Sequence, residues 1–180
     1  MTKTNSIKEK ISIPENVEIS YAEGIITVKG EKGTISKKLT HPRLKVAVTK
    51  ETVDISCTDS PKRKEKALVG TFVAHINNLI KGVTEGFEYK MKTVFSHFPI
   101  KTSVDGNHFI IENFLGERSA RKAKILEGID VEIKGDTISV KGIDKERVGQ
   151  TVANIERASK VKNRDVRIFQ DGIYRISKGD

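Results

Sequence analysis

The sequence has few of the residues on which disulfide frameworks, thiolate metal sites and aromatic pockets depend. Its 180 residues include one cysteine and no tryptophan, and aromatic residues make up only 6%. A single cysteine excludes an internal disulfide and a cysteine-rich zinc cluster. We interpret Cys57 as a small buried hydrophobic residue, because it ends an alternating, strand-like run, residues 53–57. So few aromatic residues favour an open, charged surface over a deep small-molecule pocket.

Long apolar runs are also missing. No stretch approaches the roughly 20 apolar residues that are needed to cross a bilayer, and residues 1–6 are polar and followed by Lys8, Glu9 and Lys10. The sequence therefore predicts neither a signal peptide nor a membrane span. Because a lone thiol is typical of a reducing compartment, we expect an intracellular protein.

No set of catalytic residues is recognisable. None of the histidines has a second His or a Cys at zinc-ligand spacing, and the sequence has no Gly-Lys-Ser/Thr motif and no Gly-x-Ser-x-Gly motif. The histidines are His41, His75, His97 and His108. Asp165 and Asp171 lie among cations, where pairing with a positive charge is a commoner role than acid–base catalysis. We expect a protein that is not an enzyme and that needs no cofactor or metal.

The sequence does contain an excess of positive charge. Lys and Arg number 33 against 24 Asp and Glu, which gives a net charge of +9 and a pI near 9.6. Such a charge attracts polyanions, either nucleic acid or an anionic membrane surface. A soluble protein that is merely basic would have the same net charge, so the positions of the cations have to decide.

The sequence also contains an internal repeat. Residues 69–76 (VGTFVAHI) align with residues 148–155 (VGQTVANI), and five of the eight positions are identical. A similar strand-like run precedes each copy, at residues 54–57 and 137–140. Because the order of the two elements is preserved, duplication explains the match better than chance does.

Each copy is predicted to fold as a small antiparallel sheet with one packed helix, which makes the chain an α+β protein with two tandem copies. Runs rich in β-branched residues, at residues 25–28, 44–48 and 53–57, indicate strands in the first copy. The expected boundary follows the first helix, so that residues 1–82 form the N-terminal repeat and residues 83–180 the C-terminal repeat.

The helix of the first copy is expected to begin near Pro61, with Asp59 or Ser60 as its N-cap, and to end at Gly82. One face of this helix carries Leu68, Phe72, Ile76 and Leu79.

The second copy opens with a long alternating strand, residues 87–95, which is typical of a sheet covered on one face. Gly135 and Asp136 separate two strand-like runs and indicate a hairpin. Asp144 is placed to cap the second helix. The apolar stripe of that helix consists of Val148, Val152 and Ile155.

Gly70 and Gly149 occupy the same position in the two helices. Glycine inside a helix costs roughly 0.5–1 kcal/mol relative to alanine, and both copies have it. We therefore expect each helix to approach its sheet too closely at this position to admit a side chain.

The end of the chain concentrates the positive charge. Between Arg157 and Lys178 there are seven Lys or Arg and two Asp, a net charge of +5 out of +9 for the whole chain. Arginine can bind phosphate with two donors, while Asn and Gln can bind base edges or ribose hydroxyls. A solvated charged face is the alternative, but it does not explain why one sign predominates. A second cluster that would widen the RNA-facing surface consists of Arg118, Arg121, Lys122 and Lys124, flanked by Glu117 and Glu127.

Two aromatic residues lie within this basic stretch. Phe169 and Tyr174 could stack on an unpaired base, although Phe169, beside Ile168, fits a core position better. Asp171 and Gly172 are interpreted as a turn.

With the repeat and this stretch together, the sequence resembles the large-subunit ribosomal protein six family, in its archaeal and eukaryotic branch, over essentially its full length. The resemblance rests on residues 13–17 (IPENV), the duplicated helix and residues 161–174 (VKNRDVRIFQDGIY). The last stretch looks like the signature of the branch, Arg-x-x-Arg-x-Phe-x-Asp-Gly-hydrophobic-Tyr. Arg157 stands where the branch usually has Gln, which adds a positive charge.

The resemblance implies a structural constituent of the large ribosomal subunit that binds 23S-type rRNA near the stalk base and the factor-binding region. It implies rRNA and neighbouring large-subunit proteins as partners, with no membrane and no small-molecule substrate. When the rRNA-contacting positions of the family are transferred to this sequence, they correspond to Lys160, Lys162, Asn163, Arg164, Arg167, Gln170 and Arg175. The C-terminal repeat, residues 83–180, is therefore expected to carry the main RNA-binding surface.

Two other functions are weighed against this one. A protein–protein adaptor within a ribonucleoprotein would use the basic start of the first helix, residues 62–66, to bind an acidic partner. An enzyme acting on a polyanion is disfavoured because no catalytic set is recognisable.

Overall fold

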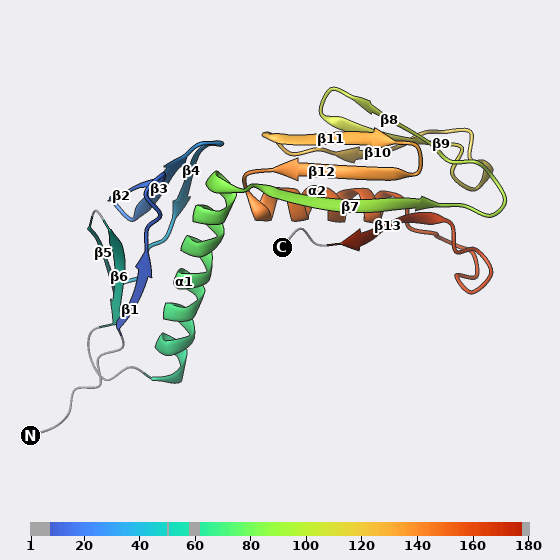
Figure 1. Ribbon diagram of the computed structural model, residues 1–180. Helices are drawn as coiled ribbons and strands as arrows, with labels where there is room; N and C mark the ends of the chain where they lie inside the picture. Colours follow the sequence, from blue (N-terminus) through green and yellow to red (C-terminus); the bar gives the residue numbers. More distant parts are fainter. Residues whose placement is uncertain (1–7, 50, 58–61, 178–180) are drawn as a thin grey trace, which may run out of the picture. The chain divides into compact units, whose positions relative to one another are not determined.

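The computed structural model describes residues 8–49, 51–57 and 62–177. The chain divides between Gly86 and Phe87 into unit 1 (residues 1–86) and unit 2 (residues 87–180), four residues beyond the boundary expected from the sequence. In the described part, each unit has antiparallel strands and one long α-helix (Figure 1). The predicted α+β class with two tandem copies is confirmed.

The described residues of unit 1 form two three-stranded antiparallel sheets and one helix. Its elements are β1 (Lys8–Ser12), β2 (Glu18–Ala22), β3 (Ile25–Gly30), β4 (Gly33–Lys38), β5 (Leu44–Val48), β6 (Thr52–Cys57) and α1 (Arg63–Thr84). The sheets have the strand orders β1-β6-β5 and β2-β3-β4, and α1 contacts strands of both. Cys57 is buried at the end of β6, as its alternating run predicted.

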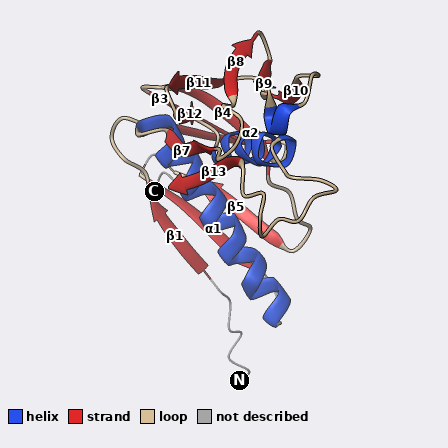
Figure 2. Ribbon diagram, turned by 90° about the vertical axis from the view of Figure 1, so that its right-hand side faces the viewer, coloured by secondary structure: helices blue, strands red, loops and turns tan. Residues whose placement is uncertain are grey.

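Unit 2 repeats this arrangement and adds one strand. Its elements are β7 (Phe87–Val94), β8 (Lys101–Asp105), β9 (His108–Glu112), the 3-10 turn η1 (Phe114–Gly116), β10 (Arg121–Lys124), β11 (Ile129–Lys134), β12 (Thr137–Gly142), α2 (Lys145–Ala158) and β13 (Gly172–Ser177). The sheets have the orders β11-β12-β7-β13 and β10-β9-β8, and α2 contacts strands of both (Figure 2).

The two units correspond strand by strand. The sheet β1-β6-β5 matches β7-β12-β11, the sheet β2-β3-β4 matches β8-β9-β10, and a helix follows the matched hairpin in each unit. The aligned positions agree in burial: Ile55 in β6 and Ile138 in β12 are both fully buried. Strand β13 has no counterpart among the described residues of unit 1 and extends the sheet of unit 2 beyond β7. It carries Arg175, while the other predicted RNA-binding residues lie in the loop between α2 and β13.

The first helix differs from its prediction at both ends. Helix α1 begins at Arg63, and Lys62 occupies the N-cap position without a side-chain cap; Asp59, Ser60 and Pro61 lie outside the described residues. Gly82 does not end the helix but is buried inside it. The glycine that follows the helix end is Gly86, whose φ of +77° is the left-handed conformation that glycine favours.

The packing explanation for the two helical glycines is wrong. A methyl group at Gly70 would meet nothing within 4 Å, and one at Gly149 would lie 3.9 Å from Tyr89 Cε2, an ordinary contact. The close approach of helix and strand in unit 2 occurs instead at Gly142, on the strand. A Cβ there would lie 2.6 Å from Ile129 Cδ1 and 2.9 Å from Val148 Cγ2.

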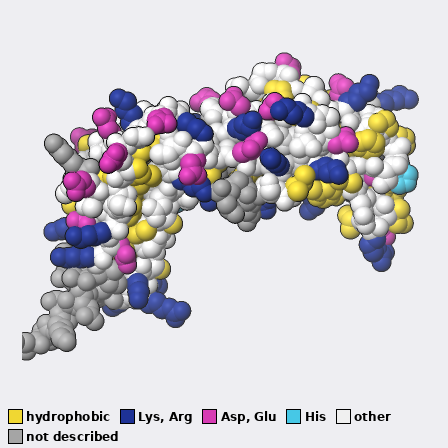
Figure 3. Space-filling model, in the orientation of Figure 1, with side chains coloured by type: hydrophobic (Ala, Val, Ile, Leu, Met, Phe, Trp, Pro, Cys, Tyr) yellow, Lys and Arg dark blue, Asp and Glu magenta, His cyan; other side chains and the backbone are white. Residues whose placement is uncertain are grey.

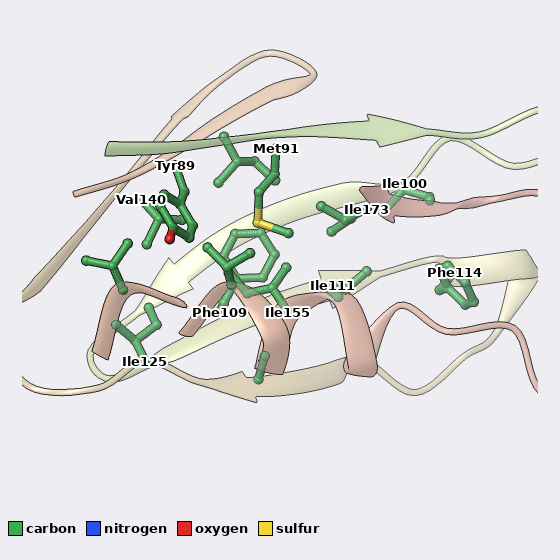
Figure 4. Packing of buried hydrophobic residues seen from close by; sticks show 14 of the residues in the cluster. Tyr89, Met91, Ile100, Phe109, Ile111, Phe114, Ile125, Val140, Ile155 and Ile173 are labelled. Atoms are coloured by element: carbon green, nitrogen blue, oxygen red, sulfur yellow. The ribbon is translucent and has the colours of Figure 1, made fainter. Parts of the chain in front are cut away.

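The core of unit 2 lies between α2 and the two sheets. Met91, Phe109 and Ile155 are fully buried there and come from β7, β9 and α2 (Figure 4). The predicted hairpin joins β11 to β12 through Gly135 and Asp136. The predicted cap also forms, because the Asp144 carboxylate accepts a hydrogen bond from the backbone N–H of Glu146 (2.9 Å).

Candidate nucleic-acid interface

The residues predicted to contact RNA lie between the end of α2 and the end of β13. We refer to residues 157–177 as the C-terminal segment; Lys178 lies outside the described residues. The segment leaves α2, makes a loop without regular secondary structure, and returns as β13 beside β7 (Figure 1). At the lower right of Figure 3, this loop carries Lys or Arg side chains next to hydrophobic ones.

Two polar side chains at the end of α2 hold β13 in place. Ser159 Oγ accepts a hydrogen bond from the backbone N–H of Ile173 (3.1 Å), and Glu156 Oε1 accepts one from the backbone N–H of Arg175 (3.1 Å). Within the described residues β13 pairs only with β7, so these two outward-facing amides would otherwise be an open sheet edge. The helix end therefore positions the strand that carries Arg175 and Tyr174.

Asp165 shapes the loop. Its Oδ1 accepts a hydrogen bond from the backbone N–H of Arg167 (2.9 Å), and its carbonyl oxygen accepts those of Ile168 (3.1 Å) and Phe169 (2.9 Å). The Arg167 guanidinium also pairs with the Asp165 carboxylate at 2.8 Å. Hydrogen bonds from the side chain and backbone of Arg167 hold the pKa of Asp165 below its ordinary value. Asp165 thus has the charged-partner role that the sequence predicted for it.

The other cations of the predicted site lack such partners. Within the described part of the chain, the remaining four form no ion pair, and all are exposed: Lys160, Lys162, Arg164 and Arg175. The guanidinium of Arg164 lies over the Phe169 ring, 4.9 Å from its centroid, which braces it at the surface. Among the residues that the structure describes, Arg167 is thus the one predicted cation of the five that a carboxylate neutralises.

The two predicted amides have separate places in the loop. Asn163 has a φ of +57°, the left-handed conformation that Asn tolerates better than most residues. Gln170 donates a long hydrogen bond from Nε2 to the Arg167 carbonyl (3.4 Å). Both side chains are exposed, and both residues lie in the loop that carries predicted cations.

Arg121 does not belong to the exposed cations, contrary to the expected second cluster. Its side chain is only 18% exposed and donates two hydrogen bonds to the Glu117 carboxylate, at 2.6 and 2.8 Å. Arg121 Nη1 also donates to the carbonyl oxygens of Ala158 and Lys160 (both 2.9 Å), and the guanidinium lies over the Phe114 ring at 4.2 Å. It therefore anchors the start of the C-terminal segment.

Glu117 connects this anchor with the exposed cations. The Arg121 guanidinium and, more weakly, the charges of Arg164 and Lys162 hold the pKa of Glu117 below its ordinary value, although burial raises it. The three other members of the second cluster remain exposed: Arg118, Lys122 and Lys124.

Asp171 and Gly172 do not form the predicted turn, and no cation in the described part of the chain forms an ion pair with Asp171. Gly172 is the first residue of β13, paired with Val94. Asp171 is buried, and its Oδ1 accepts a hydrogen bond from the backbone N–H of Ser96 (3.1 Å). This bond joins the start of β13 to the residues after β7.

The two aromatic residues differ as the sequence suggested. Phe169 is partly buried and packs against the core, with the His97 ring 5.6 Å away on centroids. Tyr174 is 49% exposed, and its hydroxyl donates a hydrogen bond to the Gln170 carbonyl (3.0 Å). Its ring covers Gly172, where a Cβ would lie 3.0 Å from Tyr174 Cζ.

Sequence reasoning missed a groove of about 380 Å³ beside these residues. It is lined by Glu156, Ser159, Lys160, Val161, Val166, Phe169, Gly172, Ile173 and Tyr174. No local pattern could have revealed it, because its walls come from a helix, a loop and a strand that meet only in the folded unit.

Two negative findings bear on other kinds of site. In residues 8–49, 51–57 and 62–177, no group of three or more His, Cys, Asp or Glu is arranged to hold a metal ion. Within the same ranges, no helix combines the length and apolarity needed to span a membrane.

Comparison with known proteins identifies the family. The model of the family described as ribosomal protein L6 matches residues 13–86 and 98–172, one match in each unit. The chain is 48% identical over 178 residues to large ribosomal subunit protein uL6 of Methanobrevibacter smithii, covering 99% of both chains. It is 46% identical to uL6 of Methanococcus vannielii over 96% of this chain and 94% of that one, and 47% identical to uL6 of Methanosarcina mazei over 96% and 97%. The chain therefore belongs to the ribosomal protein L6 family.

Proposed function

We propose that the chain is a structural constituent of the large ribosomal subunit and that it binds large-subunit, 23S-type rRNA through unit 2. The names of its relatives support the first part. One observation supports the binding of rRNA through unit 2. Four exposed cations of the C-terminal segment, Lys160, Lys162, Arg164 and Arg175, have no carboxylate partner within the described residues. An anionic backbone would supply the missing counter-charge.

The proposed contacts divide by chemistry. Lys160, Lys162, Arg164, Arg167 and Arg175 bind phosphates, while Asn163 and Gln170 bind ribose hydroxyls or base edges. The Arg164 side chain is preorganised for binding, because its guanidinium lies over the Phe169 ring. Arg167 has to share its guanidinium with Asp165, so we assign it a smaller part of the affinity than Arg164.

The proposed place in the cell rests on the resemblance to the family. The protein works in cytoplasmic ribosomes, near the stalk base and the factor-binding region, next to other large-subunit proteins. Its role is architectural, without catalysis: a folded protein surface neutralises and holds a folded RNA.

Binding to a large-subunit rRNA fragment, measured as a function of salt, tests the RNA contact. The double variant Lys162→Ala/Arg164→Ala should bind more weakly than the unmodified chain, because two phosphate contacts are lost. The slope of log K against log salt should shrink by roughly 1.4–1.8, since each phosphate contact contributes about 0.7–0.9. The melting temperature should hardly change, because both side chains are exposed.

A matched control removes two positive charges that already have partners. Lys134 pairs with Glu132 at 2.8 Å, and Lys141 lies 3.2 Å from Glu132 and 3.7 Å from Glu88. Lys134→Ala/Lys141→Ala changes the net charge equally but should leave most of the salt slope intact. Equal losses in both double variants would mean that net charge, and not this segment, determines binding.

A second candidate function, a protein–protein adaptor, rests on the start of α1. Arg63, Lys64 and Lys66 are exposed there, whereas the one carboxylate among them, Glu65, is buried and bonded to Arg43 at 2.6 Å. Nuclease footprinting separates the two functions, because an adaptor leaves naked rRNA unprotected.

A further inference from the structure

The groove of the C-terminal segment has the volume and lining of a site for a small, partly apolar group. Val161, Val166 and Phe169 from the loop form one part of its wall, while Ile173 and Tyr174 of β13 form another. Its volume of about 380 Å³ lies within the range of sites that hold small organic groups, roughly 300–1,000 Å³.

Tyr174 gives the groove a rigid aromatic surface. One side of its ring lies against Gly172, so closely that a Cβ there would be 3.1 Å from the tyrosine hydroxyl. The hydroxyl is held by the Gln170 carbonyl at 3.0 Å, and the side chain is still 49% exposed. A ring fixed in this way can stack on a planar group without a further loss of side-chain freedom.

The charges around the groove distinguish a base from a phosphate. Glu156 lines the groove and uses Oε1 to accept the Arg175 N–H, which leaves Oε2 as an acceptor. A carboxylate repels phosphate but accepts a hydrogen bond from an exocyclic amine, as Glu does with cytosine N4. Lys160, which also lines the groove, and the nearby Lys162 are cations that can hold the phosphates on either side of a base.

We propose that this groove receives one unpaired nucleotide of the bound RNA, with its base stacked on Tyr174 and its exocyclic amine donating to Glu156. The proposal rests on the proposed RNA-binding function and makes it more specific. Cytosine and adenine present an amine at this edge, whereas uracil presents a carbonyl oxygen that the carboxylate repels. The groove therefore distinguishes cytosine from uracil, two pyrimidines with similar rings.

Fluorescence anisotropy with two single-stranded RNA probes, oligocytidine and oligouridine dodecamers, tests the proposal on the full chain. The unmodified protein should bind oligocytidine several-fold more tightly. Tyr174→Leu should weaken oligocytidine binding about tenfold or more, because the stacking surface is lost. Glu156→Gln should bring the two affinities together, since the amide no longer favours an amine. Gln retains an acceptor for the Arg175 N–H, so this variant should keep its fold even if Tyr174→Leu does not.

Two controls separate the groove from its surroundings. Phe98→Leu changes a ring that is 42% exposed and lies outside the groove, and it should leave both affinities unchanged. Lys162→Ala/Arg164→Ala should weaken the binding of both probes equally and preserve the ratio of their affinities, because the two probes have the same phosphates.

The outcomes distinguish this proposal from the function on which it rests. If the rRNA fragment binds, and binding weakens in the lysine–arginine variant, but the ratio of the two probes is unchanged in both Tyr174→Leu and Glu156→Gln, the nucleotide site is refuted and RNA binding stands. If the unmodified protein binds neither the rRNA fragment nor either probe, both proposals are refuted.

Discussion

Arg121 is predicted to stabilise unit 2 more than any exposed cation near it. Arg121→Ala removes two hydrogen bonds to Glu117, two to backbone carbonyls and the contact with the Phe114 ring. Hydrogen bonds to charged groups contribute about 1.5–3 kcal/mol each in mutational series, but they are not additive. Because Glu117 is 38% exposed, solvent recovers part of this energy. We expect a net loss of about 2–4 kcal/mol in the free energy of unfolding.

Differential scanning calorimetry of the full chain measures the effect. For a unit of this size, about 1 kcal/mol shifts the melting temperature by roughly 4–8 °C, so the loss of about 2–4 kcal/mol should lower the transition of unit 2 by roughly 8–32 °C. Arg121→Lys should show most of the loss, since an ammonium cannot reach Glu117 and both carbonyls together. Lys122→Ala, on the same strand but exposed, should change stability by less than about 0.5 kcal/mol. Equal effects of Arg121→Ala and Lys122→Ala would refute the anchoring role.

Two further predictions concern glycine positions and acid stability. Gly142→Ala should destabilise unit 2 by about 1–3 kcal/mol through overpacking. Gly149→Ala should instead stabilise it by roughly 0.5–1 kcal/mol, since a methyl group fits there. Chemical denaturation of the two variants measures both changes in the free energy of unfolding, and a loss of stability in both would restore the close-packing explanation. The Arg121 guanidinium lowers the pKa of Glu117 in the folded state. The Glu117 carboxylate therefore contributes its full stability above the ordinary glutamate pKa of about 4.3. This contribution is lost as the pH falls through the lower pKa of the folded state. Thermal unfolding should therefore show a smaller loss between about pH 6 and pH 3 in Glu117→Gln than in the unmodified chain, and equal losses would contradict the assignment.

Local patterns predicted the elements of the fold well. The alternation that indicated a strand over residues 87–95 produces β7, because side chains two residues apart share a face of a strand. Ile138 and Ile155 could be placed in the core for the same kind of reason, from their positions in a strand and a helical stripe. Asp144 could be assigned as a cap because capping depends on residues within one turn.

Features that depend on distant contacts were predicted less well. Arg121 looked like one member of a basic cluster, and its contacts with the carbonyls of Ala158 and Lys160 form only when the end of α2 meets β10. Gly82 was expected to end the first helix. Instead, Gly82 is buried inside α1, the helix continues to Thr84, and Gly86 provides the left-handed residue that follows it. The packing that we expected does not explain Gly70 and Gly149, because a methyl group fits at both positions.

The candidate site was predictable in composition but not in geometry. The predicted rRNA-contacting residues could be recognised as basic and exposed, and among the described residues the Asp165 carboxylate pairs with one of their five cations, Arg167. The sequence did not indicate that Glu156 fastens β13, because that contact joins residues 19 positions apart across the end of a helix.

Footprinting of large-subunit rRNA with the full-length protein tests the central claim most directly. After cosedimentation with large subunits through a high-salt wash, the unmodified protein should protect a defined rRNA region from hydroxyl radicals. Lys162→Ala/Arg164→Ala should lose that protection, while Lys134→Ala/Lys141→Ala should retain it. Full protection by the Lys162→Ala/Arg164→Ala variant, or release of the unmodified protein without any footprint, would contradict an RNA interface on the C-terminal segment.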